Sequence, residues 1–437
     1  MTHILIHDHS SASNTLPLSV TKSHFLPLSE PARNRDKRGL GNNTKFTPAY
    51  DASRTKYQLS RNRRYGLLAV ARIVSPNSSR TRNCSCYVGK DSFGKARDNV
   101  SIQKTANGSR WNGISVCGSV WACPVCSMRI MMERQEQVMT AMSTHRSRGG
   151  SVMMSTITFS HKKFDSLKGT IERFSKALGR MKASRKYKNL KESIGFKGSI
   201  RALEITHGSN GWHPHTHDLI FIDSTLSPSE VLAFQESLFD LWFQFCKKYN
   251  LGLPTKEHGV KVDFRQDDNC SDAIGAYITK WGNEITSSHT KISKGSSRSP
   301  WQILETLTVW NHSDAKLWRE YVEAMHGRAM LHWSKGLKDE LGVNDISDQD
   351  IAEGNDGHEI LEELVVTRSE FYAICRLKKQ AQVLDRFDVS IEFASEYIAD
   401  LVERDRFNRN NEKEKYKKLE ASIYESTLKA MKRDNLN

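Results

Sequence analysis

The sequence predicts an α+β protein in which helices pack against an antiparallel sheet. Two observations favour this fold class. First, apolar segments of strand length recur, at residues 151–159, 198–206, 214–222 and about 260–264. Second, helix-like segments lie between them, at 164–186 and after the capping box Ser227-Pro228-Ser229-Glu230. An antiparallel sheet with helices packed on one side is the arrangement that this order indicates.

The two ends of the chain differ from its middle. Residues 1–65 are polar, rich in arginine and without apolar periodicity, which predicts a disordered basic arm. Residues 343–367 carry eight acidic side chains and, from Asn344 to Val366, no lysine or arginine, which predicts an acidic linker. Residues 368–437 are charged and helix-prone, so we expect a charged helical extension, either a solvated hairpin or an accessory domain. Between these ends, residues 66–148 form a cysteine-rich module with a helix, and 149–342 hold the main sheet and a helical end.

Five of the eight cysteines lie close together in the sequence. They are Cys84, Cys86, Cys117, Cys123 and Cys126. Thiolates one or two residues apart are typical of tetrahedral zinc sites in a reducing compartment. A redox-active Cys-x-x-Cys is the alternative, but such a motif belongs to a thioredoxin-like unit, whereas Met128 to His145 indicate a helix rich in methionine and arginine. We predict a structural zinc site and leave open which four thiols bind.

Three of the 16 histidines occupy alternate positions of one predicted strand, as His213, His215 and His217. Alternate side chains of a strand point to the same face, so the three imidazoles share a face. Imidazole is a common metal ligand. The alternative is a surface strand that happens to be rich in histidine. Because three rings gather on one face within five residues, we favour a metal site.

Tyr277 and Lys280 lie in a short segment, residues 272–281, whose pattern suits a helix. At a spacing of i and i+3 they would share one helix face. A phenol beside an ammonium group and near a bound cation can act as a nucleophile towards phosphorus, with Lys280 stabilising developing negative charge. Taken alone, this spacing more often reflects a packed tyrosine and a solvated lysine. The presence of the histidine strand upstream, at residues 213–217, favours the catalytic interpretation.

Taken together, these motifs resemble the HUH endonucleases and, within them, the single-tyrosine replication initiators of rolling-circle plasmids. Residues 211–217, Gly-Trp-His-Pro-His-Thr-His, resemble the metal motif of that family, and residues 276–280, Ala-Tyr-Ile-Thr-Lys, resemble its nicking-tyrosine motif. The threonine-rich strand at 155–159 and Glu204, on the strand before the histidines, occur in the same order as the corresponding motifs of the family. The resemblance covers residues 80 to 342, including the cysteines and the segment 333–337, Trp-Ser-Lys-Gly-Leu.

The resemblance implies an HUH-type sheet, a tyrosine nucleophile at Tyr277 and a divalent metal, Mg²⁺ or Mn²⁺. It implies His215, His217 and Glu204 as the metal ligands. Thr216 stands where the family usually has an apolar residue, which leaves His213 as an alternative ligand.

A second departure concerns acid–base chemistry. Single-tyrosine members carry a carboxylate about one helical turn before the tyrosine, and this chain has Ala273 there. Asp272 and Glu284 are therefore the candidates for activating water in the closing step.

The implied partners are a plasmid DNA origin, exposed as a single strand in supercoiled duplex, and the host helicase and polymerase. A formal net charge of +15 agrees with a polyanionic partner, although it also serves solubility. We expect a cytoplasmic protein without a membrane partner, because no apolar window has the length of a membrane span and the first residues lack a signal-peptide pattern. The alternatives are an HUH transposase or relaxase, and a non-enzymatic zinc-containing DNA-binding regulator.

Overall fold

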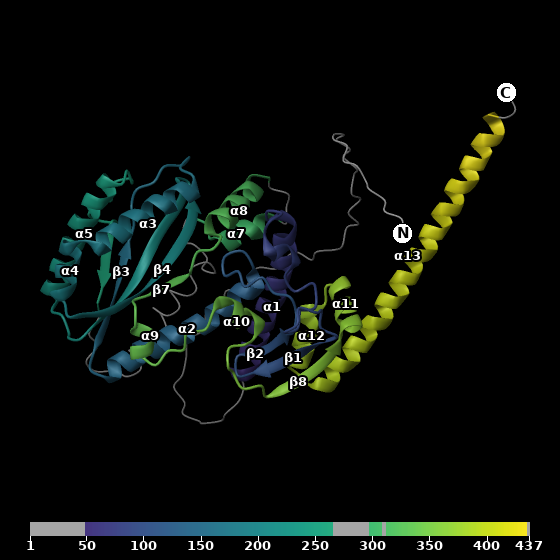
Figure 1. The fold of residues 1–437 in the computed structure, drawn as a ribbon, viewed down its shortest axis with the longest axis horizontal. Coiled ribbons are helices and arrows are strands. Elements are labelled where there is room, and N and C mark those ends of the chain that lie inside the picture. Colours follow the sequence, from purple (N-terminus) through teal and green to yellow (C-terminus); the bar gives the residue numbers. More distant parts are fainter. Residues whose placement is uncertain (1–48, 265–296, 308–311, 435–437) are drawn as a thin grey trace, which may run out of the picture. The chain divides into compact units, whose positions relative to one another are not determined.

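The computed structural model of the chain describes residues 49–264, 297–307 and 312–434. Within these residues, five antiparallel strands form the main sheet in the order β6-β3-β5-β4-β7 (Figure 1). The strands are β3 (Ser151–Ile157), β4 (Phe196–Gly208), β5 (Gly211–Ile222), β6 (Val260–Asp263) and β7 (Leu331–Trp333). The predicted α+β class is confirmed, and β3 to β6 coincide with the predicted strands. Strand β7, in a range predicted as helical, has only three residues, too few to show an alternating pattern.

Helices pack on both faces of this sheet. One face carries α3 (Leu167–Ala183), α4 (Arg185–Glu192) and α5 (Pro228–Lys248), and the other carries α2 (Pro124–Ser147) and α9 (Leu337–Glu340). Because side chains alternate along β5, Ile220 and Ile222 join the core with α3 and α5, whereas Leu219 and Phe221 join the core with α2. The prediction of helices on one side alone was wrong, because α2 supplies a second apolar layer.

Local sequence signals explain where these helices begin and end. The predicted capping box is present at α5, where Ser227 accepts from the backbone of Glu230 and the Glu230 side chain reaches back. The segment predicted as one helix over 164–186 is instead two helices joined at Ser184. Ser184 is extended, with φ −70° and ψ 151°, and its hydroxyl accepts from the backbone N–H of Tyr187, so it ends α3 and caps α4.

A second cluster of buried side chains surrounds the cysteines. It joins the helix α1 (Ala49–Val74) to α7 (Pro300–Thr306), α8 (His312–Met325) and α10 (Asp348–Glu353), and η1 (Arg80–Asn83) lies beside it in sequence. Helix α1 begins inside the range predicted as a disordered arm, of which residues 1–48 lie outside the described residues. The arginines that suggested disorder include Arg61, which is buried because Asp385 and Asp388 neutralise it at 2.7 and 2.9 Å.

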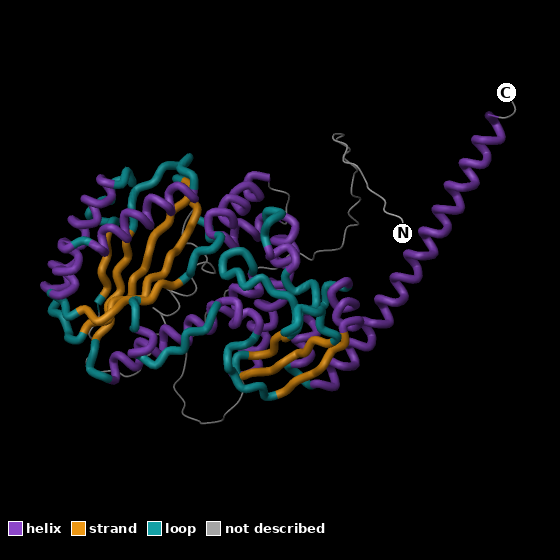
Figure 2. Tube along the Cα trace, viewed as in Figure 1, coloured by secondary structure: helices purple, strands orange, loops and turns teal. Residues whose placement is uncertain are grey.

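A smaller sheet has the order β2-β1-β8 in the described residues (Figure 2). It consists of β1 (Asn99–Thr105), β2 (Gly108–Asn112) and β8 (Glu362–Thr367), and α11 (Arg368–Arg376), α12 (Gln380–Phe387) and the first part of α13 (Ile391–Asp434) pack on it. Strand β8 and α10 fall in the range expected to be an acidic linker. The acidic side chains are cross-strand partners: Glu362 pairs with Lys104 at 3.0 Å, and Glu363 accepts from Gln103 at 2.9 Å.

The predicted helical extension is confirmed by α11, α12 and α13. Helix α13 leaves the small sheet after its first turns, and residues 406–422 are exposed at every position (Figure 1). None of the helices in the described ranges combines the length and the apolarity that a membrane crossing needs.

We expect two leucines of α13 to contribute very differently to stability. Leu401 is 1% exposed and packs on the small sheet, so Leu401→Ala should lower the free energy of unfolding by about 2–5 kcal/mol through lost burial and a cavity. Leu419 is 56% exposed on the same helix, and Leu419→Ala should change it by less than about 0.5 kcal/mol. Urea unfolding of both variants measures the difference, and equal losses would contradict this packing.

Candidate metal centre and cysteine cluster

The hairpin of β4 and β5 brings Glu204 and two of the histidines together. In its register Glu204 pairs with His215 and Ala202 with His217. The Glu204 Oε2 atom lies 3.5 Å from Nε2 of His215 and 3.2 Å from Nε2 of His217. All three side chains are at least 85% buried. Two ring nitrogens and a carboxylate oxygen therefore converge on one small volume, as a divalent cation requires.

The outer nitrogens of the two rings contact neighbouring oxygen atoms. Nδ1 of His217 lies 3.0 Å from the hydroxyl of Thr156, its cross-strand partner on β3. Nδ1 of His215 lies 3.4 Å from the carbonyl oxygen of His213. Because a carbonyl only accepts, Nδ1 of His215 is the donor in this contact, and Nε2 is the ring nitrogen that faces Glu204. Such outer contacts orient imidazoles towards a metal.

The charge at Glu204 also fits a cation site. Burial raises the pKa of its carboxyl, but hydrogen bonds and charge from His215 and His217 outweigh burial and hold the pKa well below its usual range. The group is therefore a carboxylate at neutral pH. A buried carboxylate beside two ring nitrogens needs protons or a cation between them, so these three residues could hold a metal.

His213, the alternative ligand, faces a different partner. Its Nδ1 lies 3.1 Å from Nδ1 of His161, and its Nε2 lies 3.2 Å from the hydroxyl of Thr158. Burial, with the charges of His215 and His161, lowers the pKa of His213 to about 3, so the ring is neutral. His213 is thus beside the group formed by Glu204, His215 and His217 but outside it. The sequence did not predict a role for His161, because this residue lies in the loop after β3 and is not part of a periodic pattern.

Thr216, the departure in the histidine motif, and Asp218 lie on the opposite face of β5. Thr216 is 2% exposed and points away from the histidines, as strand alternation requires. Asp218 binds the ammonium group of Lys182, on α3, at 2.6 Å. Neither residue perturbs the candidate metal centre. The other expected site residues, Tyr277, Lys280, Asp272 and Glu284, lie outside the described residues.

Four of the five candidate zinc cysteines form one buried cluster. The Sγ atom of Cys84 lies 3.5 Å from those of Cys123 and Cys126, and the Sγ atoms of Cys117 and Cys126 are 3.8 Å apart. In a tetrahedral zinc site with bonds of about 2.3 Å, sulfur atoms stand about 3.8 Å apart. Cys86 is not in the cluster, and the chain turns between it and Cys84 at Ser85, which has a φ of 57°. Of the five candidates that the sequence left open, the structure therefore groups Cys84, Cys117, Cys123 and Cys126 and leaves out Cys86.

Burial and local hydrogen bonds shift the pKa values of these thiols in opposite directions. Burial raises the pKa of the Cys123 thiol, and the neighbouring thiols raise it further. Hydrogen bonds from the other three cysteines lower the pKa of Cys84. The backbone N–H of Cys126 donates to the Cys123 sulfur at 3.4 Å, and the Thr81 hydroxyl donates to Cys117 at 3.7 Å. Four buried thiols with donors aimed at two of them could hold a zinc ion.

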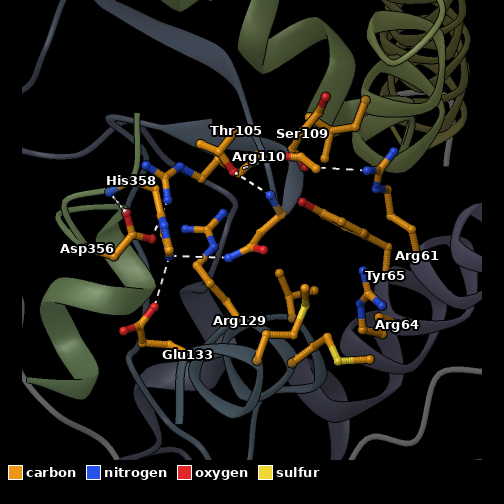
Figure 3. Close-up of a pocket in the computed structure, with 16 residues that line it drawn as sticks. Arg61, Arg64, Tyr65, Thr105, Ser109, Arg110, Arg129, Glu133, Asp356 and His358 are labelled. Carbon is orange, nitrogen blue, oxygen red and sulfur yellow. Dashed lines mark hydrogen bonds and ion pairs between the residues drawn. The ribbon is translucent and has the colours of Figure 1, made fainter. Parts of the chain in front are cut away.

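A separate cavity of about 80 Å³ lies between α1, the β1–β2 hairpin and α2 (Figure 3). Three of its arginines connect distant segments. Arg61 reaches Asp385 and Asp388, Arg110 binds Asp356 and the Gly354 carbonyl, and Arg129 donates to the carbonyls of Ala352 and Trp111. These contacts hold residues 352–358 and α12 to α1, α2 and the small sheet. The cavity is thus a polar junction within the fold.

A family model and one relative similar to this chain are replication proteins by their printed descriptions, and a second relative has a different printed name. The model of a protein family described as "Replication protein" matches residues 110–382. "Protein rep" of Streptomyces lividans is 26% identical over 350 residues, which cover 63% of this chain and 76% of that protein. The "Neomycin resistance protein" of Streptomyces cyanogenus is 28% identical over 137 residues, 25% of this chain and 31% of that protein. No solved structure matches the chain.

We predict that the cysteine cluster holds zinc for stability. Because structural zinc contributes directly to folding, Cys123→Ser should lower the midpoint of thermal unfolding by at least about 5 °C and release the metal. Cys86→Ser is the matched control, since Cys86 lies outside the cluster, and should change the midpoint by less than about 2 °C. Calorimetry and elemental analysis after dialysis measure both effects. Purified protein that holds no zinc would refute the assignment.

Proposed function

This chain belongs to the replication protein (Rep) family of plasmid replication initiators, and from that premise we propose that it starts rolling-circle replication. In this proposal it nicks one strand of a plasmid origin through Tyr277 and later rejoins the displaced strand. The observation that carries the proposal is the Glu204 carboxylate, which faces Nε2 of both His215 and His217 on adjacent strands.

These three residues would hold Mg²⁺ or Mn²⁺, since a mixed imidazole and carboxylate set suits a cation that also contacts phosphate oxygen. When bound, the cation supplies Lewis-acid polarisation of the scissile phosphate. The residues of the chain would position the ligands and keep the carboxylate charged. Thr156 and the His213 carbonyl orient the two rings, and the low pKa of Glu204 keeps its carboxylate charged.

The proposed chemistry is a transesterification. The phenol oxygen of Tyr277 forms a bond to phosphorus while the bond from phosphorus to the 3′ oxygen breaks. The phenol loses its proton to a base, and the leaving 3′ oxygen gains one. The products are a 5′-phosphotyrosine link and a free 3′-hydroxyl, which a host polymerase extends after a host helicase opens the duplex. Lys280 would stabilise the developing charge, and Asp272 or Glu284 would serve the closing step.

We predict that the two ligand histidines are needed for metal-dependent nicking of supercoiled origin plasmid. His215→Ala and His217→Ala should each weaken Mn²⁺ binding by more than about tenfold and abolish nicking, as a chelator should. His258→Ala is the control because His258 is exposed and outside the group. Calorimetric Mn²⁺ titration and a gel assay give the two readouts. Full nicking by the double variant would exclude this metal assignment.

A second prediction distinguishes transesterification from hydrolysis. A single-stranded origin oligonucleotide labelled on the downstream fragment should leave its label on the protein under denaturing conditions, because the phosphodiester bond is exchanged rather than hydrolysed. Tyr277→Phe removes the hydroxyl and should abolish the adduct while sparing DNA binding. Lys280→Ala should slow adduct formation without eliminating it.

Tyr249→Phe provides the matched control for that experiment, since Tyr249 is a partly buried tyrosine at the end of α5. It should form the adduct at the wild-type rate. An adduct that persists in Tyr277→Phe would identify another nucleophile. Origin binding without any nick or adduct in the wild-type protein would instead support the non-enzymatic DNA-binding regulator.

A further inference from the structure

Phe164 lies in the loop between β3 and α3, and its side chain is 92% exposed. A single exposed aromatic ring is common on protein surfaces and carries no conclusion by itself. Two further features distinguish Phe164. Its loop is fixed by several contacts, and the same loop touches His213, which lies beside the candidate metal centre.

The loop is fixed from within and from the neighbouring hairpin. The Asp165 carboxylate accepts from the backbone N–H of Lys162 at 2.9 Å, and the Asp165 N–H donates to the Lys162 carbonyl at 3.0 Å. Gly211 begins β5 with a φ of 86°, and a Cβ atom there would lie 2.8 Å from the Lys163 carbonyl oxygen. Only glycine permits this approach of the two backbones. Phe164 therefore projects into solvent from an ordered turn.

The loop reaches the metal group through His161. The His161 ring contacts His213 at 3.1 Å, and the His213 and His215 rings have centroids 5.0 Å apart. His161 and Phe164 are three residues apart, so their Cα atoms are separated by at most about 11 Å. The steps from His161 to His213 and from His213 to His215, with ring centroids 4.8 and 5.0 Å apart, add to that separation. A base on Phe164 would therefore lie within several stacked nucleotides of a phosphate at the metal centre.

The charges around the ring suit a nucleic-acid strand. Lys162 and Lys163 precede Phe164 and are exposed, and the Lys163 ammonium group lies 5.9 Å from the Phe164 ring centroid. Lysine side chains attract phosphates, and an aromatic ring stacks on bases of any sequence. An aromatic ring with adjacent cations is the usual arrangement of a surface that binds single strands.

We propose that Phe164 stacks on an unpaired base of the origin strand several nucleotides from the scissile phosphate, while Lys162 and Lys163 contact the backbone. The ligand is single-stranded DNA, an identity that rests on the proposed function. Stacking at this position would hold the strand in register across the metal centre. Phe164 is accordingly a positioning residue, because it touches the substrate away from the reacting atoms.

Binding of single-stranded DNA tests this proposal. Fluorescein-labelled oligonucleotides that tile the DNA flanking the gene for this chain are titrated in chelator, which stops nicking, and anisotropy gives the dissociation constant. Phe164→Ala should weaken the tightest complex by about 5- to 150-fold, the range of one base stack. Phe164→Trp should bind as tightly as wild type. The matched control is Phe93→Ala, since Phe93 is 93% exposed in the loop before β1 and should have no effect.

A scan with single abasic nucleotides identifies the stacked base. At one position the abasic change should weaken wild-type binding but cause no further loss in Phe164→Ala, because both changes remove the same contact. Wild-type affinity in Phe164→Ala, or losses that add at every position, would overturn the proposal. If wild-type protein binds none of the strands, both proposals fail. Coupling at one base without any Tyr277 adduct would exclude the nicking chemistry alone, and an adduct without coupling would exclude the stacking alone.

Discussion

The candidate metal centre depends on the register of the β4–β5 hairpin. Glu204 pairs directly with His215, and His217 stands one alternate position further along the same face. A slip of one residue would carry Glu204 to the opposite face, because side chains alternate along a strand. The short turn between Gly208 and Gly211 fixes the pairing at one end of the hairpin. The positive φ of Gly211 also lets that turn touch the β3–α3 loop, so one glycine sets both the register and the neighbouring loop.

The opposite face of β5 favours the same register for an electrostatic reason. Asp218 is 2% exposed and is paired with Lys182 of α3 at 2.6 Å. Burial lowers the pKa of Lys182 below its usual value, and the charge of Asp218 partly opposes that effect. A slipped strand would leave the buried Asp218 carboxylate without the partly buried Lys182 ammonium group, which is unfavourable. Strand β5 therefore holds two candidate ligands on one face and one member of a partly buried ion pair on the other, so a shift in register would disrupt both.

Much of this arrangement could be predicted from local sequence, and the rest depends on long-range contacts. The histidine strand was recognisable from alternating residues, and the α5 capping box from residue types at a fixed spacing. Both signals lie within one short segment of sequence. The acidic residues Glu362 and Glu363 did not indicate a strand, because their partners Lys104 and Gln103 are far away in sequence. Arg61 suggested a solvated arm for the same reason, since Asp385 and Asp388 are more than 300 residues distant. His161 has a role in the site only through the fold, which brings its loop to His213.

The tryptophan of the histidine motif connects the metal centre to the cysteine cluster. Trp212 is 3% exposed, its indole N–H donates to Glu320 at 3.0 Å, and the other oxygen of Glu320 accepts from the backbone N–H of Leu167. Trp212 also stacks on Tyr321, with ring centroids 6.0 Å apart, and both rings belong to the core that includes the four clustered cysteines. The start of β5 is thus held by α8 and by the first turn of α3. Because the same core surrounds the cysteines, disorder at that cluster would reach the first residues of the histidine strand, and structural zinc would support the metal centre through packing rather than through chemistry.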